Sequence, residues 1–91
     1  DPIVEYENFI NNEKDKELQA IADQFSIDKE SLKKISDDYS FYQDDIGLNR
    51  DVTTLLSSNN DIDITKRISI ITQLPGMIKG FFDKFNDITI Y

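Results

Sequence analysis

The 91-residue sequence contains no cysteine and no histidine. Without cysteine, neither a disulfide framework nor a thiolate metal site can form, and a cytoplasmic location is allowed. Without histidine, the chain lacks the commonest general base, and the two absences together remove the usual zinc ligands and nucleophile triads. The sequence therefore offers few of the residue types on which enzyme active sites are usually built.

Long apolar runs and an excess of basic charge are also missing. No run approaches the roughly 20 apolar residues that span a bilayer, so we expect no membrane segment. Ten basic against eighteen acidic residues give a net charge of -8, which repels a phosphate backbone. Residues 1–61 hold fifteen acids and six bases, whereas residues 62–91 hold three acids and four bases. We do not expect this chain to bind nucleic acid by itself.

The length fits a single small domain over residues 1–91 with one compact core. The sequence begins at Asp1 without an initiator methionine, and its only methionine is Met77. We therefore expect the domain to be a piece of a larger subunit.

Hydrophobic periodicity predicts helices. Asp1-Pro2 suits an N-cap followed by proline at the first helical position, and apolar residues then recur at helical spacing as far as Phe25. This pattern predicts a helix from about Pro2 to Gln24. A second helix, capped by Asp28, has Leu32, Ile35 and Tyr39 on its inner face. The short turn between them predicts an antiparallel pair.

The remainder of the chain is less regular. Residues 40–49 contain acids and a glycine that favour turns, so we expect irregular chain there. Asn49 can cap a short third helix, and a further helix begins near Asp63 and is kinked or broken at Pro75-Gly76. The tail, residues 87–91, is expected to be frayed or extended. The prediction is an all-α domain of about four to five helices; the alternative is that the β-branched residues of 62–72 form strands.

Four apolar residues have no place on a predicted helix face, namely Phe41, Tyr42, Ile46 and Leu48. Aromatic residues are enriched among the anchors of protein interfaces, so we predict that these four contact a partner protein. The aromatic group Phe81, Phe82 and Phe85 allows a similar interpretation. The alternative for both groups is that they fill the core of the domain itself.

Searches for chemical motifs give no catalytic, cofactor-binding or metal-binding residues. Asn59, Asp61 and Asp63 match the start of a calcium-binding loop, but Ile64 stands where the glycine belongs and Ile70 where the closing glutamate belongs. No lysine follows an acid by two positions, as restriction-type nucleases require, and no Gly-Lys pair exists to cradle a phosphate. The adjacent acids of 37–38 and 44–45 are typical of solvated charge.

Several segments resemble the C-terminal helical domain of the motor subunit, or R subunit, of type I restriction enzymes. The similar segments are residues 5–10, 16–22 and 27–35, then Asp38-Tyr39 before the aromatic turn at 41–42, the paired leucines of 52–56, and the basic-isoleucine entry at 65–68 into a helix that reaches Phe82. Two departures from the family pattern are the acidic turn at 43–47 and Pro75-Gly76.

The resemblance implies a parent subunit that carries a nuclease and two helicase-like motor domains, and that uses ATP and magnesium to translocate and cut DNA in the cytoplasm. It implies that this domain attaches that subunit to the methyltransferase and specificity subunits, with DNA contacted only through the parent. None of the parent's catalytic motifs occurs in residues 1–91. The alternative function is a free-standing acidic helical protein that imitates DNA or binds another protein, although lysines interrupt its acids.

Overall fold

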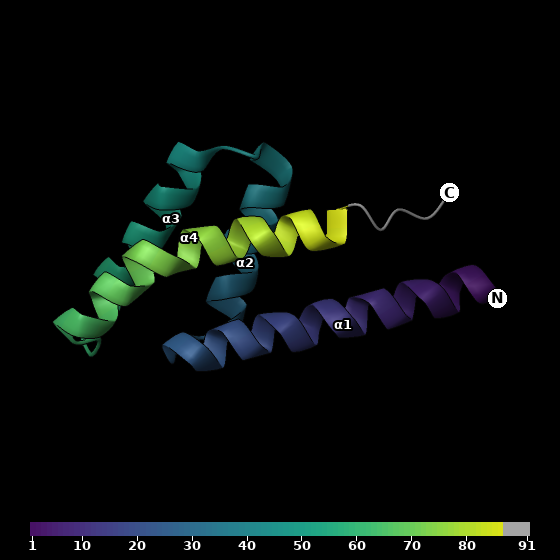
Figure 1. The fold of residues 1–91 in the computed structure, drawn as a ribbon, viewed down its shortest axis with the longest axis horizontal. Helices are drawn as coiled ribbons and strands as arrows, with labels where there is room; N and C mark the ends of the chain where they lie inside the picture. Colours follow the sequence, from purple (N-terminus) through teal and green to yellow (C-terminus); the bar gives the residue numbers. More distant parts are fainter. Residues whose placement is uncertain (87–91) are drawn as a thin grey trace.

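The computed structural model describes residues 1–86 and contains four helices (Figure 1). These are α1 (Pro2–Phe25), α2 (Lys29–Tyr42), α3 (Asp45–Ser57) and α4 (Ile64–Asn86). No strand occurs within residues 1–86, so the all-α prediction is confirmed. Residues 62–72, the candidate strand segment, instead lead into and begin α4. The expectation for the tail concerns residues 87–91, which lie outside the described part.

An aspartate stands at the start of every helix. The side chains of Asp1 and Asp28 accept hydrogen bonds from the amides of Ile3 at 3.0 Å and Ser31 at 3.1 Å. Asp44 accepts from Ile46 at 3.1 Å, and Asp63 accepts from Lys66 at 2.8 Å. Each carboxylate satisfies an amide that has no partner within its helix and places negative charge at the positive end of the helix dipole. These four side chains account for part of the acidity of the chain.

The connection between α2 and α3 differs from the sequence prediction. Residues 40–49 were expected to be irregular and Asn49 to be a cap, yet only Gln43 and Asp44 separate the two helices. Gln43 ends α2 in the left-handed conformation at φ 50°, and Asp44 caps α3. The prediction is wrong because aspartate favours helix caps as well as turns, and a cap at Asp44 allows Asp45 to begin a helix directly.

The angle between α1 and α2 also differs from the prediction. Ser26 adopts a left-handed conformation at φ 55°, and its amide donates to the carbonyls of Ala22 and Asp23. This C-cap redirects the chain, and α2 crosses α1 steeply instead of running antiparallel to it (Figure 1). The bounds of α1 itself agree with the predicted helix to within one residue.

The core is one contiguous apolar cluster to which all four helices contribute. Its largest fully buried side chains are Leu32 of α2 and Ile70, Leu74 and Ile78 of α4. Phe81 and Phe85 also belong to this cluster, and Phe82 meets Tyr39 edge-on at 5.5 Å, so these phenylalanines contribute to the core and its edge. From α1, only the residues from Leu18 onward are buried, which leaves the N-terminal part of that helix outside the core (Figure 1).

Helix α4 runs through Pro75 without a break. Proline removes one amide donor from the helix interior, and Figure 1 shows α4 bending along its length. Leu74 and Ile78, on either side of Pro75, are both fully buried. Burial of these two side chains offsets the cost of the proline, so the helix bends but remains continuous.

Arg67 holds the loop between α3 and α4. Its guanidinium donates to the carbonyls of Leu56 and Ile62, each at 2.8 Å, and to that of Asn59 at 2.5 Å. The planar, multiply donating guanidinium can bind three carbonyls that diverge in this way, whereas an ammonium group on a lysine side chain cannot reach all three.

We predict that Arg67→Lys lowers the free energy of unfolding by about 2 kcal/mol, because carbonyls at the end of α3 lose charge-assisted hydrogen bonds. Urea denaturation followed by circular dichroism measures this loss. The matched control is Lys66→Ala, which removes a single exposed hydrogen bond to Ser26 and is expected to change stability by less than about 0.5 kcal/mol. Equal losses for the two variants would contradict the assigned role of Arg67.

Candidate protein-interaction surface

Three large apolar side chains project from the corner between α2 and α3. Phe41 is 79% exposed, Tyr42 is 71% exposed and Ile46 is 70% exposed. We call these three residues the corner patch. The rings of Phe41 and Tyr42 meet edge-to-face, with their centroids 4.8 Å apart and their planes at 77°. The corner patch is therefore an aromatic surface that the core of the domain does not cover.

The local sequence explains why these residues are exposed. The inner face of α2 consists of Leu32, Ile35 and the half-buried Tyr39, and Tyr39 completes it by contacting Phe82. Phe41 and Tyr42 follow in the last turn of α2, away from that face. The connection between α2 and α3 has only two residues and ends at the cap Asp44. Ile46 therefore lies in the first turn of α3, near the end of α2.

Leu48 does not belong to the corner patch. The sequence pattern predicts irregular chain at Leu48 and groups it with the other three residues as a partner contact. Because α3 begins at Asp45, Leu48 instead lies on the same helix face as Val52 and Leu55, and it is only 3% exposed. Its side chain belongs to the core and is not available on the surface. A role in partner binding stays a prediction for Phe41, Tyr42 and Ile46.

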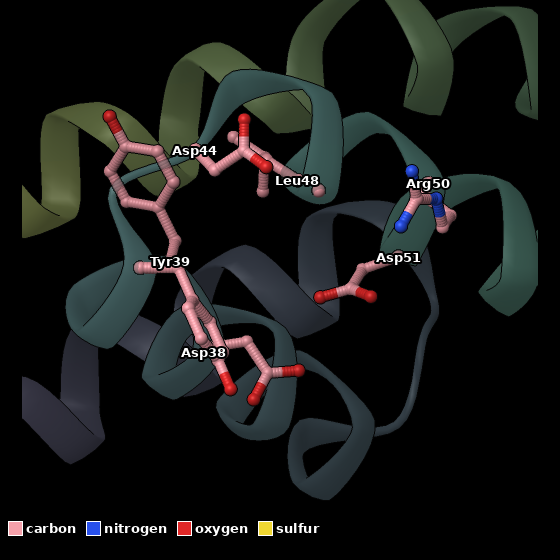
Figure 2. A pocket seen from close by; sticks show the side chains of 8 residues that line it. Asp38, Tyr39, Asp44, Leu48, Arg50 and Asp51 are labelled. Carbon is pink, nitrogen blue, oxygen red and sulfur yellow. The ribbon is translucent and has the colours of Figure 1, made fainter.

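A cavity of about 280 Å³ adjoins the corner patch between α2 and α3. It is lined by Asp38, Tyr39, Tyr42, Asp44, Gly47, Leu48, Arg50 and Asp51. Figure 2 shows the carboxylates of Asp38 and Asp51 turned toward each other, with Arg50 next to Asp51 on α3. Three acids and one base thus surround the cavity, and this edge of the corner patch is acidic.

The pKa of the Asp51 carboxyl is raised above its usual value. Partial burial is the main cause, and the nearby Asp38 raises this pKa further by hydrogen bonding and by charge. Lys34 and Arg50 act in the opposite direction but do not cancel these effects. Sequence reasoning did not find this pair, because Asp38 and Asp51 lie on different helices and only the short turn at 43–44 brings them together.

The other acids singled out in the sequence have structural partners. Asp63 caps α4, and the Asn59 amide donates to the Leu55 carbonyl at 2.7 Å. Asp44 caps α3, while Asp45 pairs with Lys79 at 3.1 Å. Within residues 1–86, no three His, Cys, Asp or Glu side chains gather as metal ligands would. No helix in the same range combines the length and hydropathy of a membrane span.

We predict that Asp51→Asn stabilises the domain at pH 7. A raised folded-state pKa means that the folded protein binds more protons than the unfolded chain as pH falls toward the unfolded pKa of about 4. The free energy of unfolding therefore decreases as pH rises from the unfolded pKa of Asp51 through its folded pKa. This loss of stability is complete at pH 7. Because Asp51 is only partly buried and solvent screens its charge, the gain is expected to be below about 1 kcal/mol.

Urea denaturation at pH 7 and at pH 3 measures the effect of Asp51→Asn. The gain should vanish at pH 3, where the carboxyl is protonated in both states, and Asp37→Asn on the exposed side of α2 serves as the control. A gain of the same size at both pH values would show that the charge of Asp51 is not its cause.

Comparison with known proteins identifies the family. A family model described as "Type I restriction and modification enzyme - subunit R C terminal" matches residues 1–85. No curated protein and no solved structure gives a significant match. The match covers all four helices except the last residue of α4, and it agrees with the resemblance found in the sequence. The chain therefore belongs to the family of C-terminal domains of the R subunit of type I restriction and modification enzymes.

Proposed function

We propose that this domain is a non-catalytic attachment module that docks the R subunit onto the methyltransferase and specificity subunits through the corner patch. The observation that supports the proposal is the exposure of Phe41, Tyr42 and Ile46 beside an acidic cavity. The family match supports the assignment to an R subunit, and the patch supplies a surface on which docking can occur.

The chemistry of the corner patch suits an interface anchor. Complete burial of a large apolar side chain contributes about 1.5–3 kcal/mol relative to leaving it exposed. Aromatic residues often dominate the energy of an interface when they fill a partner's pocket. Phe41 and Tyr42 already contact each other, so less side-chain freedom is lost when they bind than for two independent rings.

The acids beside the patch indicate the chemistry of the partner. Asp38, Asp44 and Asp51 surround the cavity, with Arg50 as the single base. A partner surface with exposed lysine or arginine around an apolar pocket would complement this edge and would be steered toward it. The same acidity disfavours direct contact with DNA, so we assign DNA contact to the parent subunit.

Catalysis is assigned to other parts of the parent subunit. Binding of ATP and magnesium would belong to its motor domains, because this chain has no phosphate-cradling motif and its described residues form no cluster of metal ligands. A cytoplasmic location follows from the same assignment, since a restriction enzyme acts where the DNA is.

The first experiment is a calorimetric titration of this chain into a purified methyltransferase-specificity complex from the same source, with and without DNA. We expect saturable binding that does not require DNA. Tyr42→Ala and Phe41→Ala are each expected to weaken binding at least about 10-fold, because truncation of a central aromatic anchor typically costs 2 kcal/mol or more.

The matched control is Phe9→Ala, which removes an exposed phenylalanine from α1, a helix that contributes nothing to the corner patch. It should leave the affinity unchanged. Unchanged binding by Tyr42→Ala and Phe41→Ala would contradict the assignment of the patch. Failure of the domain to bind, together with inhibition of a DNA-binding enzyme, would favour the acidic DNA mimic instead.

A further inference from the structure

The cavity beside the corner patch adjoins a second cavity between the same two helices. This second cavity has a volume of about 240 Å³, and its lining includes Ser31, Thr54 and Ser58. Asp38 and Asp51 line both cavities, so the two hollows meet at one pair of carboxylates. Together they form a groove between α2 and α3, which we call the α2–α3 groove.

One end of the α2–α3 groove is continuous with the corner patch. Tyr42 belongs to the patch and also lines the cavity at that end of the groove. Asp38 stands four residues before Tyr42 on α2, and residues with this spacing are neighbours on one helix face, with Cβ atoms about 5–6 Å apart. A partner segment that covers Tyr42 and continues along this face of α2 therefore meets the carboxylate pair next.

The carboxylate pair has no ion-pair partner among residues 1–86. Figure 2 shows the two carboxylates turned toward each other, and neither Asp38 nor Asp51 forms a salt bridge with a lysine or arginine of that range. The nearby charges of Lys34 and Arg50 favour the ionised form of Asp51. Burial and the Asp38 carboxylate oppose that form more strongly, so the pKa of Asp51 stays above its usual value. The negative charge of the pair is thus incompletely compensated by this chain.

An arginine side chain fits the chemistry of this position. Its guanidinium is planar and has five N–H donors, so it can donate to two carboxylates at once. Asp38 and Asp51 are both partly buried, and an ion pair is screened less there than at the open surface. Tyr39 and Tyr42 line the same cavity, and the faces of aromatic rings attract a guanidinium.

We propose that the α2–α3 groove receives an arginine side chain of the methyltransferase-specificity complex, and that its guanidinium binds between Asp38 and Asp51. The inference rests on the proposed docking through the corner patch and names a second contact of the same interface. The partner surface then carries this arginine about one helical turn from the apolar pocket that covers Phe41 and Tyr42. On a partner helix, that separation corresponds to three or four residues.

Calorimetric titration into the purified methyltransferase-specificity complex from the same source tests the groove. The double variant Asp38→Asn/Asp51→Asn keeps the shapes of both side chains and removes their charges. It is expected to weaken binding at least about 10-fold, because an interfacial arginine loses its charged partners. The matched control, Asp37→Asn/Asp61→Asn, removes the same charge at exposed positions outside the groove and should stay close to the wild-type affinity. Equal affinities of the two double variants would overturn the proposal.

A second measurement uses a small probe and does not depend on the complex. N-acetyl-L-arginine amide carries one guanidinium and no other charge, and neutral N-acetyl-L-glutamine amide is its control. In proton-nitrogen correlation spectra of the free chain, the arginine probe should shift the amides of Gly47 and Thr54 saturably. The control probe should not shift them, and neither should the arginine probe added to Asp38→Asn/Asp51→Asn.

The two measurements separate the groove from the proposed function. Absence of these shifts in the wild-type chain would overturn the groove as an arginine site, whether or not the complex binds. A chain that shows the shifts but does not bind the complex would support the groove and contradict the attachment function. Weakened binding by Tyr42→Ala, with the groove variant binding like wild type, would support attachment and contradict the groove.

Discussion

The apolar face of α4 is the surface on which the domain is assembled. Three of the four fully buried large side chains, Ile70, Leu74 and Ile78, lie on this face, and α4 packs against each of the other three helices. A domain of this length buries a modest share of its surface, so its stability depends on a few contacts from which water is completely excluded. The persistence of α4 through Pro75 follows from this dependence, since a break there would separate Leu74 from Ile78.

The candidate function depends on the turn between α2 and α3. Gln43 in a left-handed conformation and the cap at Asp44 join the two helices through only two residues. This geometry forces the last turn of α2 and the first turn of α3 into one corner. Phe41, Tyr42 and Ile46 are exposed there. The same turn brings Asp51 close to Asp38, and partial burial together with Asp38 raises the pKa of Asp51. One short turn thus creates both the corner patch and its acidic edge.

The sequence predicted those parts of the fold that depend on helical periodicity. The bounds of α1, the cap at Asp28 and the entry into α4 at Asp63 follow from apolar spacing and capping chemistry over a few residues. The family also followed from the sequence, because its similar segments are spread over most of the chain. Such features are local, and local patterns contain the information that specifies them.

The sequence did not predict features for which the same residues are compatible with two local structures. Asp44, Asp45 and Gly47 favour a turn, but Asp44 can equally cap a helix, and packing of Leu48, Val52 and Leu55 against the core selects the helix. The burial of Leu48 and the approach of Asp38 to Asp51 both follow from that selection. The crossing of α1 and α2 depends on the left-handed conformation of Ser26, which a non-glycine residue adopts only in a suitable tertiary context.

The measurement that tests the central claim most directly is hydrogen-deuterium exchange of this chain, free and bound to the methyltransferase-specificity complex. Docking through the corner patch predicts new protection of amides around the α2–α3 turn at residues 41–48, with the exchange of the first turns of α1 unchanged. Protection confined to α1 or α4, with the α2–α3 turn exchanging as it does in the free chain, would contradict the account.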